Sequence, residues 1–445
     1  MHVLAVADTD SYLKWSAATL ASLPPDWTST SVLLRNAVMP SASQIAAADQ
    51  VAGDRAGVRT LALPVLLALL VRERPDVVLL ACTGPVVQTL TRLPLLRGPR
   101  RPVLLTGLPG ISIPASPKAV LLRRACDLFV VHSHRERQEF LAVAAEVAPT
   151  LGFRLARLPF LPGVGDGVLA APAPAAPDAP LVFASQARVP PLREQREQVL
   201  RALAAATPAV VKLRAGTGEQ QTHREAHPYD VLWHDLVAAG EVTAGAVGFA
   251  TGAMTAALTG SRGLVTVSST AALEAIALGR PLLVVDDFGI SAEMINLVFA
   301  GSGCTGSLAT LAEGGLRTPD PDWLVENYFH PDEDSDWLVR LRVLVSLRSA
   351  GQLPQPDGSA PATAGQTLRQ YLRMALSVED LARSERVLRR LRRWSRAPRA
   401  RARRARARLR GRPAAAAPAG PPPAPPLARR PPPPASPPGP ADRGR

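Results

Sequence analysis

Short apolar runs alternate along the chain with longer amphipathic stretches. In the first third, Val- and Leu-rich runs occur at residues 2–7, 76–82, 102–107 and 127–133, each followed by polar or glycine residues. Continuous apolar runs of this length are typical of buried parallel strands, and the stretches between them have helical length. The pattern predicts a Rossmann-like, doubly wound α/β domain over residues 1–165.

A second alternating series follows a segment dense in Pro, Gly and Ala, which we interpret as a linker over residues 166–180. Its apolar runs lie at 181–185, 209–214, 263–269 and 281–287. We expect a second Rossmann-like domain over 181–350, with a cleft between the two domains. A loop and helix over 351–395 and a disordered Pro-, Ala- and Arg-rich tail over 396–445 complete the prediction.

The positive charge is confined to one end of the chain. The net charge is +14, but residues 383–445 hold 19 arginines and two acids, which leaves 32 basic and 35 acidic side chains in residues 1–382. The globular part is therefore not basic, and this distribution argues against nucleic acid as its partner. Leu388, Leu391 and Trp394 lie among the arginines, a pattern that favours peripheral contact with an anionic membrane.

Cysteine usage and apolar run lengths limit the cellular setting. Cys82, Cys126 and Cys304 show no metal-ligand or disulfide-framework spacing, so we expect a reducing compartment and no metal site. The first residues lack the features of a signal peptide, and the apolar run at 61–71 is too short to span a bilayer. We expect a cytoplasmic protein that touches the inner face of the plasma membrane.

The strongest local pattern is VTVSSTAALEAIALGRPLLVVDD at 265–287. Ser268, Ser269 and Thr270 end a predicted strand and begin a helix, and the backbone N–H groups of a helix N-terminus bind phosphate. Glu274 lies one turn into the helix, where it can accept hydrogen bonds from ribose hydroxyls. Gly279 is placed to close the helix.

This segment resembles the carboxy-terminal half of GT-B glycosyltransferases and of the related UDP-sugar epimerases, through Ser268 to Thr270, Glu274, Ala277, Gly279 and Pro281. The chain as a whole, including ADTDSYLKW at 7–15, looks like an uncharacterised actinobacterial glycosyltransferase family. The resemblance implies a GT-B-like fold whose second domain binds a nucleotide-sugar donor. It implies a glycan or lipid-linked acceptor on the first domain, and transfer with no metal and no cofactor beyond the nucleotide-sugar co-substrate.

Two further segments are candidates for donor binding. Lys212 and Arg214 end a predicted strand, and two cations there would neutralise a diphosphate leaving group. Ser291 is placed to cap a helix expected after the strand at 281–287, and in GT-B proteins this loop approaches the donor sugar. An ordinary strand end and an ordinary turn remain the plainer alternatives.

The first domain supplies candidates for the acceptor side. Asp8 and Asp10 follow the first predicted strand, and we take Asp10 as the first choice for a catalytic base and Asp8 as the second, with helix capping as the alternative. His132 ends another strand and can serve as a base or orient the acceptor. Gly107 and Gly110, in a Gly- and Pro-containing loop, would let a ligand approach the backbone.

Other activities remain open. Asp8-Thr9-Asp10 is similar to the DxDx(T/V) motif of haloacid-dehalogenase phosphatases, whose first Asp attacks phosphorus, but Tyr12 replaces the Thr or Val. A non-catalytic adaptor could use the basic tail to bind nucleic acid or membrane. NAD binding is disfavoured because no GxGxxG follows the first strand.

Overall fold

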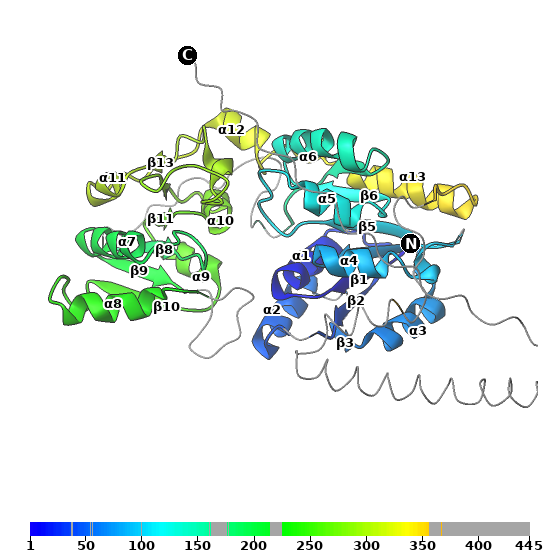
Figure 1. Ribbon diagram of the computed structural model, residues 1–445, viewed down its shortest axis with the longest axis horizontal. Coiled ribbons are helices and arrows are strands. Elements are labelled where there is room, and N and C mark those ends of the chain that lie inside the picture. The colour runs from blue at the N-terminus through cyan, green and yellow to red at the C-terminus, as the bar shows by residue number, and fades with distance from the viewer. Residues whose placement is uncertain are drawn as a thin grey trace, which may run out of the picture. The chain divides into compact units, whose positions relative to one another are not determined.

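Seven parallel strands form the first sheet of the computed structural model, in the order β3-β2-β1-β4-β5-β6-β7 (Figure 1). They are β1 (His2–Ala7), β2 (Thr28–Leu34), β3 (Arg59–Leu61), β4 (Val77–Ala81), β5 (Val103–Gly107), β6 (Leu128–Val131) and β7 (Gly152–Leu155). The four predicted apolar runs became β1, β4, β5 and β6. The pattern missed β2, whose first half, Thr28 to Ser31, is polar, and the short strands β3 and β7.

The structure describes residues 1–36, 39–53, 55, 57–98, 100–159, 161, 176, 178–213, 225–355 and 366. Residues 1–381 form one unit and residues 382–445 another. Arg214, most of the predicted linker, most of the predicted loop and helix over 351–395, and the predicted basic tail lie outside the described residues.

Helices cover both faces of the first sheet, because its strands are apolar on both sides, and this cover buries them. On one face lie α3 (Leu63–Glu73), α4 (Gly84–Leu90), α5 (Pro117–Arg123) and α6 (His134–Val147). On the other lie α1 (Asp10–Ala21), α2 (Ala42–Ala52) and α13 (Trp337–Ser349).

Helix α13 departs from the predicted domain boundary. The prediction placed residues up to 350 in the second domain, whereas Trp337, Leu341 and Leu344 pack into the apolar cluster of the first sheet. We therefore call residues 1–159 together with 337–353 the first lobe, and residues 178–326 the second lobe.

Six parallel strands form the second sheet, in the order β10-β9-β8-β11-β12-β13. They are β8 (Leu181–Ala184), β9 (Ala209–Lys212), β10 (Val247–Ala250), β11 (Gly263–Thr266), β12 (Leu282–Val285) and β13 (Thr305–Gly306). One face packs against α7 (Arg193–Ala205), α8 (Tyr229–Ala238) and α11 (Leu308–Ala312), and the other against α9 (Met254–Thr259), α10 (Ala271–Ala277) and α12 (Pro321–Glu326). The prediction of two doubly wound α/β domains is confirmed.

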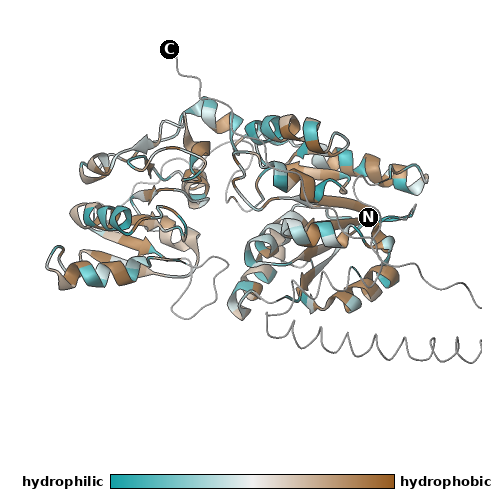
Figure 2. Ribbon diagram, in the orientation of Figure 1, coloured by the Kyte–Doolittle hydropathy of each residue, from teal (hydrophilic) through white to brown (hydrophobic). Residues whose placement is uncertain are grey.

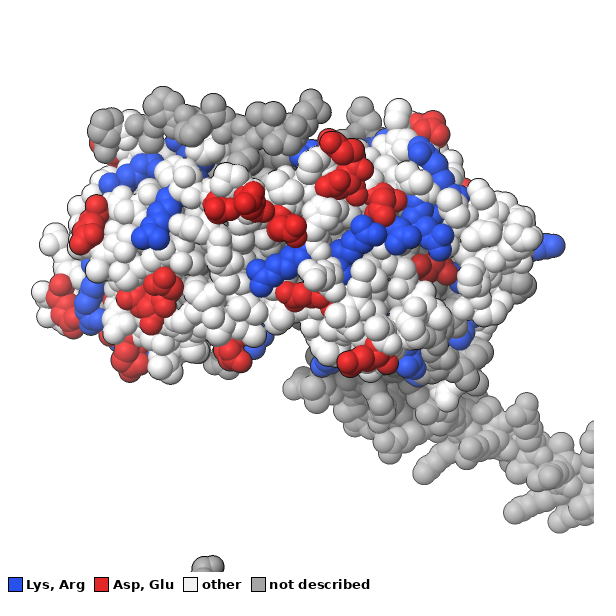
Figure 3. Space-filling model, turned by 90° about the horizontal axis from the view of Figure 1, so that it is seen from above, with Lys and Arg blue, Asp and Glu red and all other residues white. Residues whose placement is uncertain are grey.

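The strands are the most apolar elements of both lobes, whereas the helices carry polar as well as apolar residues (Figure 2). The run at 61–71 lies largely in α3, where Leu63, Leu66, Leu69 and Leu70 are buried in the core. Among the described residues, no helix is both long and apolar enough to cross a bilayer. On the face drawn in Figure 3, basic and acidic side chains are interspersed, as expected for a globular part without a strong net charge.

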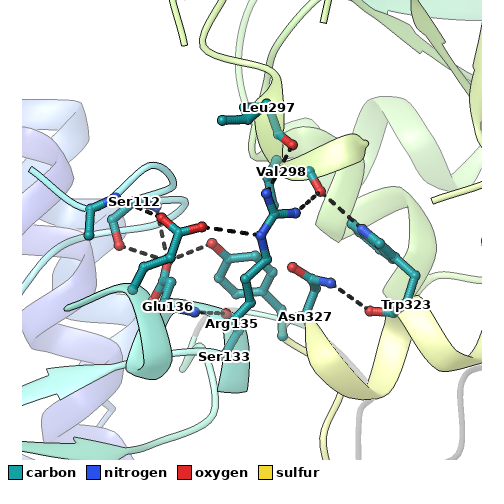
Figure 4. Close-up of polar contacts among 11 residues, drawn as sticks. Ser112, Ser133, Arg135, Glu136, Leu297, Val298, Trp323 and Asn327 are labelled. Atoms are coloured by element: carbon teal, nitrogen blue, oxygen red, sulfur yellow. Dashed lines mark hydrogen bonds and ion pairs between the residues drawn. The ribbon is translucent and has the colours of Figure 1, made fainter. Parts of the chain in front are cut away.

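Contacts at the start of α6 join the two lobes (Figure 4). Arg135 donates hydrogen bonds to the carbonyl oxygens of Val298 (3.2 Å) and Leu297 (3.4 Å) in the second lobe. Ile113, from the loop after β5, is 4% exposed and belongs to the apolar cluster of the second sheet. The core of the second lobe is therefore completed by a residue of the first.

Candidate functional site

The second sheet reverses its strand order between β8 and β11, and ligands of open α/β sheets bind beyond the carboxyl ends of the strands at such a point. Helix α10 follows β11 there, and it carries Glu274 in its first turn. Lys212 ends β9, the strand on the other side of β8. The topology thus brings two of the predicted donor-binding residues to the same edge of the sheet.

Lys14, on α1 of the first lobe, lies near both of these residues. Burial raises the pKa of the Glu274 carboxyl, and the Lys14 and Lys212 ammonium groups oppose that rise. Burial lowers the pKa of Lys212, and the positive charge of Lys14 lowers it further, while Glu274 acts in the opposite direction. We call Lys14, Lys212 and Glu274 the interlobe charge cluster.

Lys212 is a buried cation, with 4% of its surface exposed. Its Nζ donates to the carbonyl oxygen of Gly252 at 2.7 Å and to that of Leu213 at 3.4 Å. An ammonium group has three donors, and within the described part of the chain two of them have acceptors. The alternative of a solvated strand end does not describe Lys212.

The three small polar residues before α10 have different surroundings. Ser268 is buried and its hydroxyl donates to the carbonyl oxygen of Ile295 at 2.5 Å, which ties the strand end to the next loop. Ser269 Oγ accepts from the N–H of Ala271 at 3.2 Å and so caps the helix. Thr270 makes no capping hydrogen bond with its side chain. Of the three, Ser268 and Ser269 have a local structural explanation.

Ser291 also acts within its own loop. Its Oγ accepts from the N–H of Met294 at 3.3 Å, and its N–H donates to Asn296 Oδ1 at 2.9 Å. Asn296 is fully buried and donates to the carbonyl oxygen of Gly289 at 3.0 Å. The helix expected after residues 281–287 is wrong, because residues 291–295 form a turn, which these bonds hold in place. The plainer alternative of an ordinary turn describes Ser291.

Gly107 and Gly110, the two glycines predicted to admit a ligand, are required for different contacts. A Cβ on Gly107 would lie 2.7 Å from the Trp15 ring, so this position is glycine because an indole packs against the strand end. A Cβ on Gly110 would lie 2.9 Å from Thr270 Cγ2. Gly110 and Thr270, predicted on opposite sides of the site, are therefore neighbours across the lobes.

Asp8 and Asp10 differ sharply in burial. Asp8 is 2% exposed, and its carboxyl accepts from the N–H of Thr83 (3.0 Å) and from its hydroxyl (2.5 Å). Burial raises the pKa of Asp8, and the hydrogen bonds from Thr83 and the charge of Arg123 oppose the rise. Asp10 is the first residue of α1 and is partly exposed. Asp10 and Lys14 are four residues apart, so they share one face of that helix.

His132 does not have the surroundings of a catalytic base. It is 2% exposed, its Nε2 lies 2.9 Å from Trp15 Nε1, and its Nδ1 lies 3.1 Å from the carbonyl oxygen of Ala156. An indole N–H only donates and a carbonyl only accepts, so the proton resides on Nδ1 and both ring nitrogens are engaged. Burial lowers the pKa of His132. The geometry assigns it a structural position.

Sequence reasoning underrated Lys14 and Glu136. Lys14 is one of only three lysines and lies one helical turn from Asp10, a signal that was available. Glu136 lies three residues after Ser133, a spacing typical of a helix cap, and Ser133 Oγ does accept from the N–H of Glu136 at 3.0 Å. The Glu136 carboxyl, fully buried, also accepts from Ser112, His132 and Tyr328. Ser112 and Tyr328 lie 24 and 192 residues away in the sequence, so these two donors could not be foreseen from that pattern.

Comparisons with known proteins add a family match. Residues 3–344 match the model of a family described as "Putative glycosyltransferase (DUF6716)". No curated protein matches the sequence.

Several solved structures are similar at low identity. A putative UDP-N-acetylglucosamine 2-epimerase from Listeria monocytogenes is 12% identical with a TM-score of 0.46, over 81% of this chain and 99% of that one. Arabidopsis thaliana UGT89C1 is 13% identical with a TM-score of 0.48, over 79% and 99%. Anabaena Alr3699/HepE, in complex with UDP and glucose, is 14% identical with a TM-score of 0.45, over 79% and 100%.

Proposed function

Because the family model spans residues 3–344, the chain belongs to this family of putative glycosyltransferases, and we propose that it moves a sugar from a nucleotide-sugar donor to a glycan or lipid-linked acceptor. The observation that carries the proposal is the interlobe charge cluster. It joins a cation of the first lobe, Lys14, to a cation and an acid of the second lobe, Lys212 and Glu274.

The chemistry of the cluster suits a nucleoside diphosphate. Negative charge grows on the diphosphate as its bond to the sugar breaks, and ammonium groups placed beforehand stabilise that charge. Lys14 and Lys212 would supply this stabilisation from opposite lobes. Glu274 would accept hydrogen bonds from ribose hydroxyls, and no step of this scheme requires a metal ion.

The acceptor would be activated by an acid of the first lobe. Asp10 is the better candidate for the base, since it is partly exposed and shares a helix face with Lys14. Asp8 is held by Thr83 and is nearly inaccessible. The arginines of residues 383–445 favour an acceptor at an anionic membrane surface, because such a tail is attracted to it.

The test is nucleotide binding by the full chain. Thermal shift and calorimetry with UDP, GDP, CMP and their sugar conjugates should identify at least one stabilising ligand, since a ligand of the native state raises its stability. Lys14→Met should lower the affinity for that ligand about tenfold to a hundredfold. This is the range expected for the loss of a charge-assisted hydrogen bond of about 1.5–3 kcal/mol.

The third lysine provides a matched control. Lys118 is exposed on α5 and is not among the groups that act on Lys212 or Glu274. Lys118→Met should bind the nucleotide as the wild type does. Equal losses in both variants, or no stabilisation by any nucleotide or nucleotide-sugar, would overturn the proposal.

A further inference from the structure

Three side chains of the types that ligate metals gather outside the interlobe charge cluster, at the start of α6. His134 is the first residue of that helix, and His330 and Asp334 lie on the segment that leads from α12 to α13. The donor atoms of the three side chains all lie within 4.8 Å of one another. Among the described residues, this is the group of His, Cys, Asp and Glu side chains that could hold a metal ion.

His330 is arranged as a metal ligand would be. Its Nδ1 lies 3.0 Å from the carbonyl oxygen of Pro331, which can only accept, so the proton is on Nδ1 and the lone pair on Nε2. Metal-ligating histidines characteristically donate their other ring N–H to such a carbonyl, which fixes the tautomer and orients the ring.

The Nε2 atom of His330 is itself without a partner. The residue is fully buried, and this nitrogen has no hydrogen bond within the described part of the chain. A buried polar atom left unpaired is costly, typically about 1–3 kcal/mol, and is uncommon in folded proteins.

The other two side chains, His134 and Asp334, are partly open to solvent, so an ion could reach the cluster from that side. The His134 and Asp334 side chains are 32% and 36% exposed, and His134 Nε2 lies 2.8 Å from Asp334 Oδ2. Arg157 is the neighbouring cation, and its guanidinium is paired with the Asp332 carboxylate at 2.7 Å. This pairing offsets the repulsion that Arg157 would exert on a metal ion.

We propose that His134, His330 and Asp334 bind a divalent transition metal, with water completing the coordination. Two imidazoles and one carboxylate are typical zinc ligands, and Co²⁺ and Ni²⁺ accept the same donors. A tetrahedral site with bonds of about 2.0 Å separates its donor atoms by roughly 3.3 Å. Side-chain rotations of the two partly exposed ligands would therefore bring the group to coordination distance.

The position of the site gives it a mechanical role. His134 belongs to the first lobe, whereas His330 lies on the segment that follows α12 of the second lobe. Tyr328, on the same segment, already donates a hydrogen bond to Glu136 of α6 at 2.5 Å. A metal bound here would tie the segment between α12 and α13 to the N-terminus of α6. It would reinforce the connection between the lobes without taking part in sugar transfer, so the inference does not depend on the proposed function.

The experiment measures metal binding by the full chain after chelator treatment and buffer exchange. Calorimetry with ZnCl₂ and the visible spectrum with CoCl₂ should show one high-affinity ion per chain, with the intense absorption of tetrahedral Co²⁺. His134→Ala and Asp334→Asn change partly exposed side chains, and each should weaken metal binding at least about tenfold.

His234, an exposed histidine on α8, supplies the matched control. His234→Ala should keep the wild-type affinity and Co²⁺ spectrum. The proposal fails if no ion binds stoichiometrically, if His134→Ala and Asp334→Asn bind as tightly as the wild type, or if His234→Ala loses as much affinity as they do.

Discussion

Thr270 places its Cγ2 2.9 Å from the position that a Cβ on Gly110 would occupy, so the first lobe meets helix α10 through a residue without a side chain. Gly110 also has φ +113°, a conformation that L-residues rarely adopt. Two independent constraints, one from the backbone and one from the second lobe, thus require glycine at this position.

We expect Gly110→Ala to lower the free energy of unfolding by about 1–3 kcal/mol through backbone strain, and to displace α10 from the loop through the clash with Thr270. Urea denaturation and nucleotide affinity measure the two effects. Gly245→Ala is the control, because Gly245 has φ +92° with nothing within 4 Å of the added Cβ. If both variants lose stability but keep nucleotide affinity, the contact with Thr270 is not part of the site.

Glu136 should be a main determinant of the connection between the lobes. Glu136→Gln puts an amide where the carboxyl accepts from Ser112, His132 and Tyr328, and leaves at least one buried donor without an acceptor. We expect a loss of about 1–3 kcal/mol in the free energy of unfolding. Glu146→Gln, at an exposed position of the same helix, should change it by less than about 0.5 kcal/mol. Similar losses in the two variants would contradict this role.

Glu274 should make stability depend on pH. Its pKa is raised by burial, so the native state holds this proton more tightly than the unfolded chain does. The free energy of unfolding therefore falls as the pH rises from about 4.3, the ordinary value for Glu, through the raised native pKa. Glu274→Gln should remove this part of the slope, measured as urea midpoints between about pH 4 and 8.

Lys14→Met tests whether the charge of Lys14 acts on the Glu274 carboxyl. The Lys14 ammonium group lowers the pKa of Glu274, so its removal should raise that pKa and extend the destabilising window to higher pH. A pH profile identical to that of the wild type would mean that the two charges do not interact across the lobes.

Substitutions of Asp10 and Asp8, the two acids after β1, should affect different quantities: catalysis for Asp10 and stability for Asp8. Asp10→Asn should lower kcat by about 10²–10⁴, the usual contribution of a general base, with little change in stability. Asp8→Ala should lower the free energy of unfolding by about 1–3 kcal/mol, because the N–H and the hydroxyl of Thr83 lose their acceptor. Steady-state kinetics and denaturation on both variants decide between them, and a reversed pattern would make Asp8 the base.

Much of the architecture follows from local sequence patterns. β1 was predicted residue for residue, because an uninterrupted apolar run ends abruptly at Asp8. The helix closure at Gly279 was also predicted, and this residue adopts φ +63°, which favours glycine. Such features depend only on neighbouring residues.

Long-range pairings could not be predicted from the same patterns. Nothing near His132 indicates that Trp15 will occupy its Nε2, and nothing near Lys212 indicates that Gly252 will hold its ammonium group. The cluster of His134, His330 and Asp334 was overlooked because two of its ligands are 200 residues apart in the sequence. Spacing rules for metal motifs only detect ligands that lie close together along the chain.

The packing of α13 on the first sheet has a consequence for biosynthesis. Residues 2–155 supply every strand of that sheet, yet Trp337 and Leu341, which cover part of one face, emerge from the ribosome only after the whole second lobe. At about 5–20 residues per second, the uncovered apolar surface persists for on the order of ten seconds or more. The nascent first lobe is thus a natural client for chaperones, and expression of residues 1–160 alone should yield an aggregation-prone fragment.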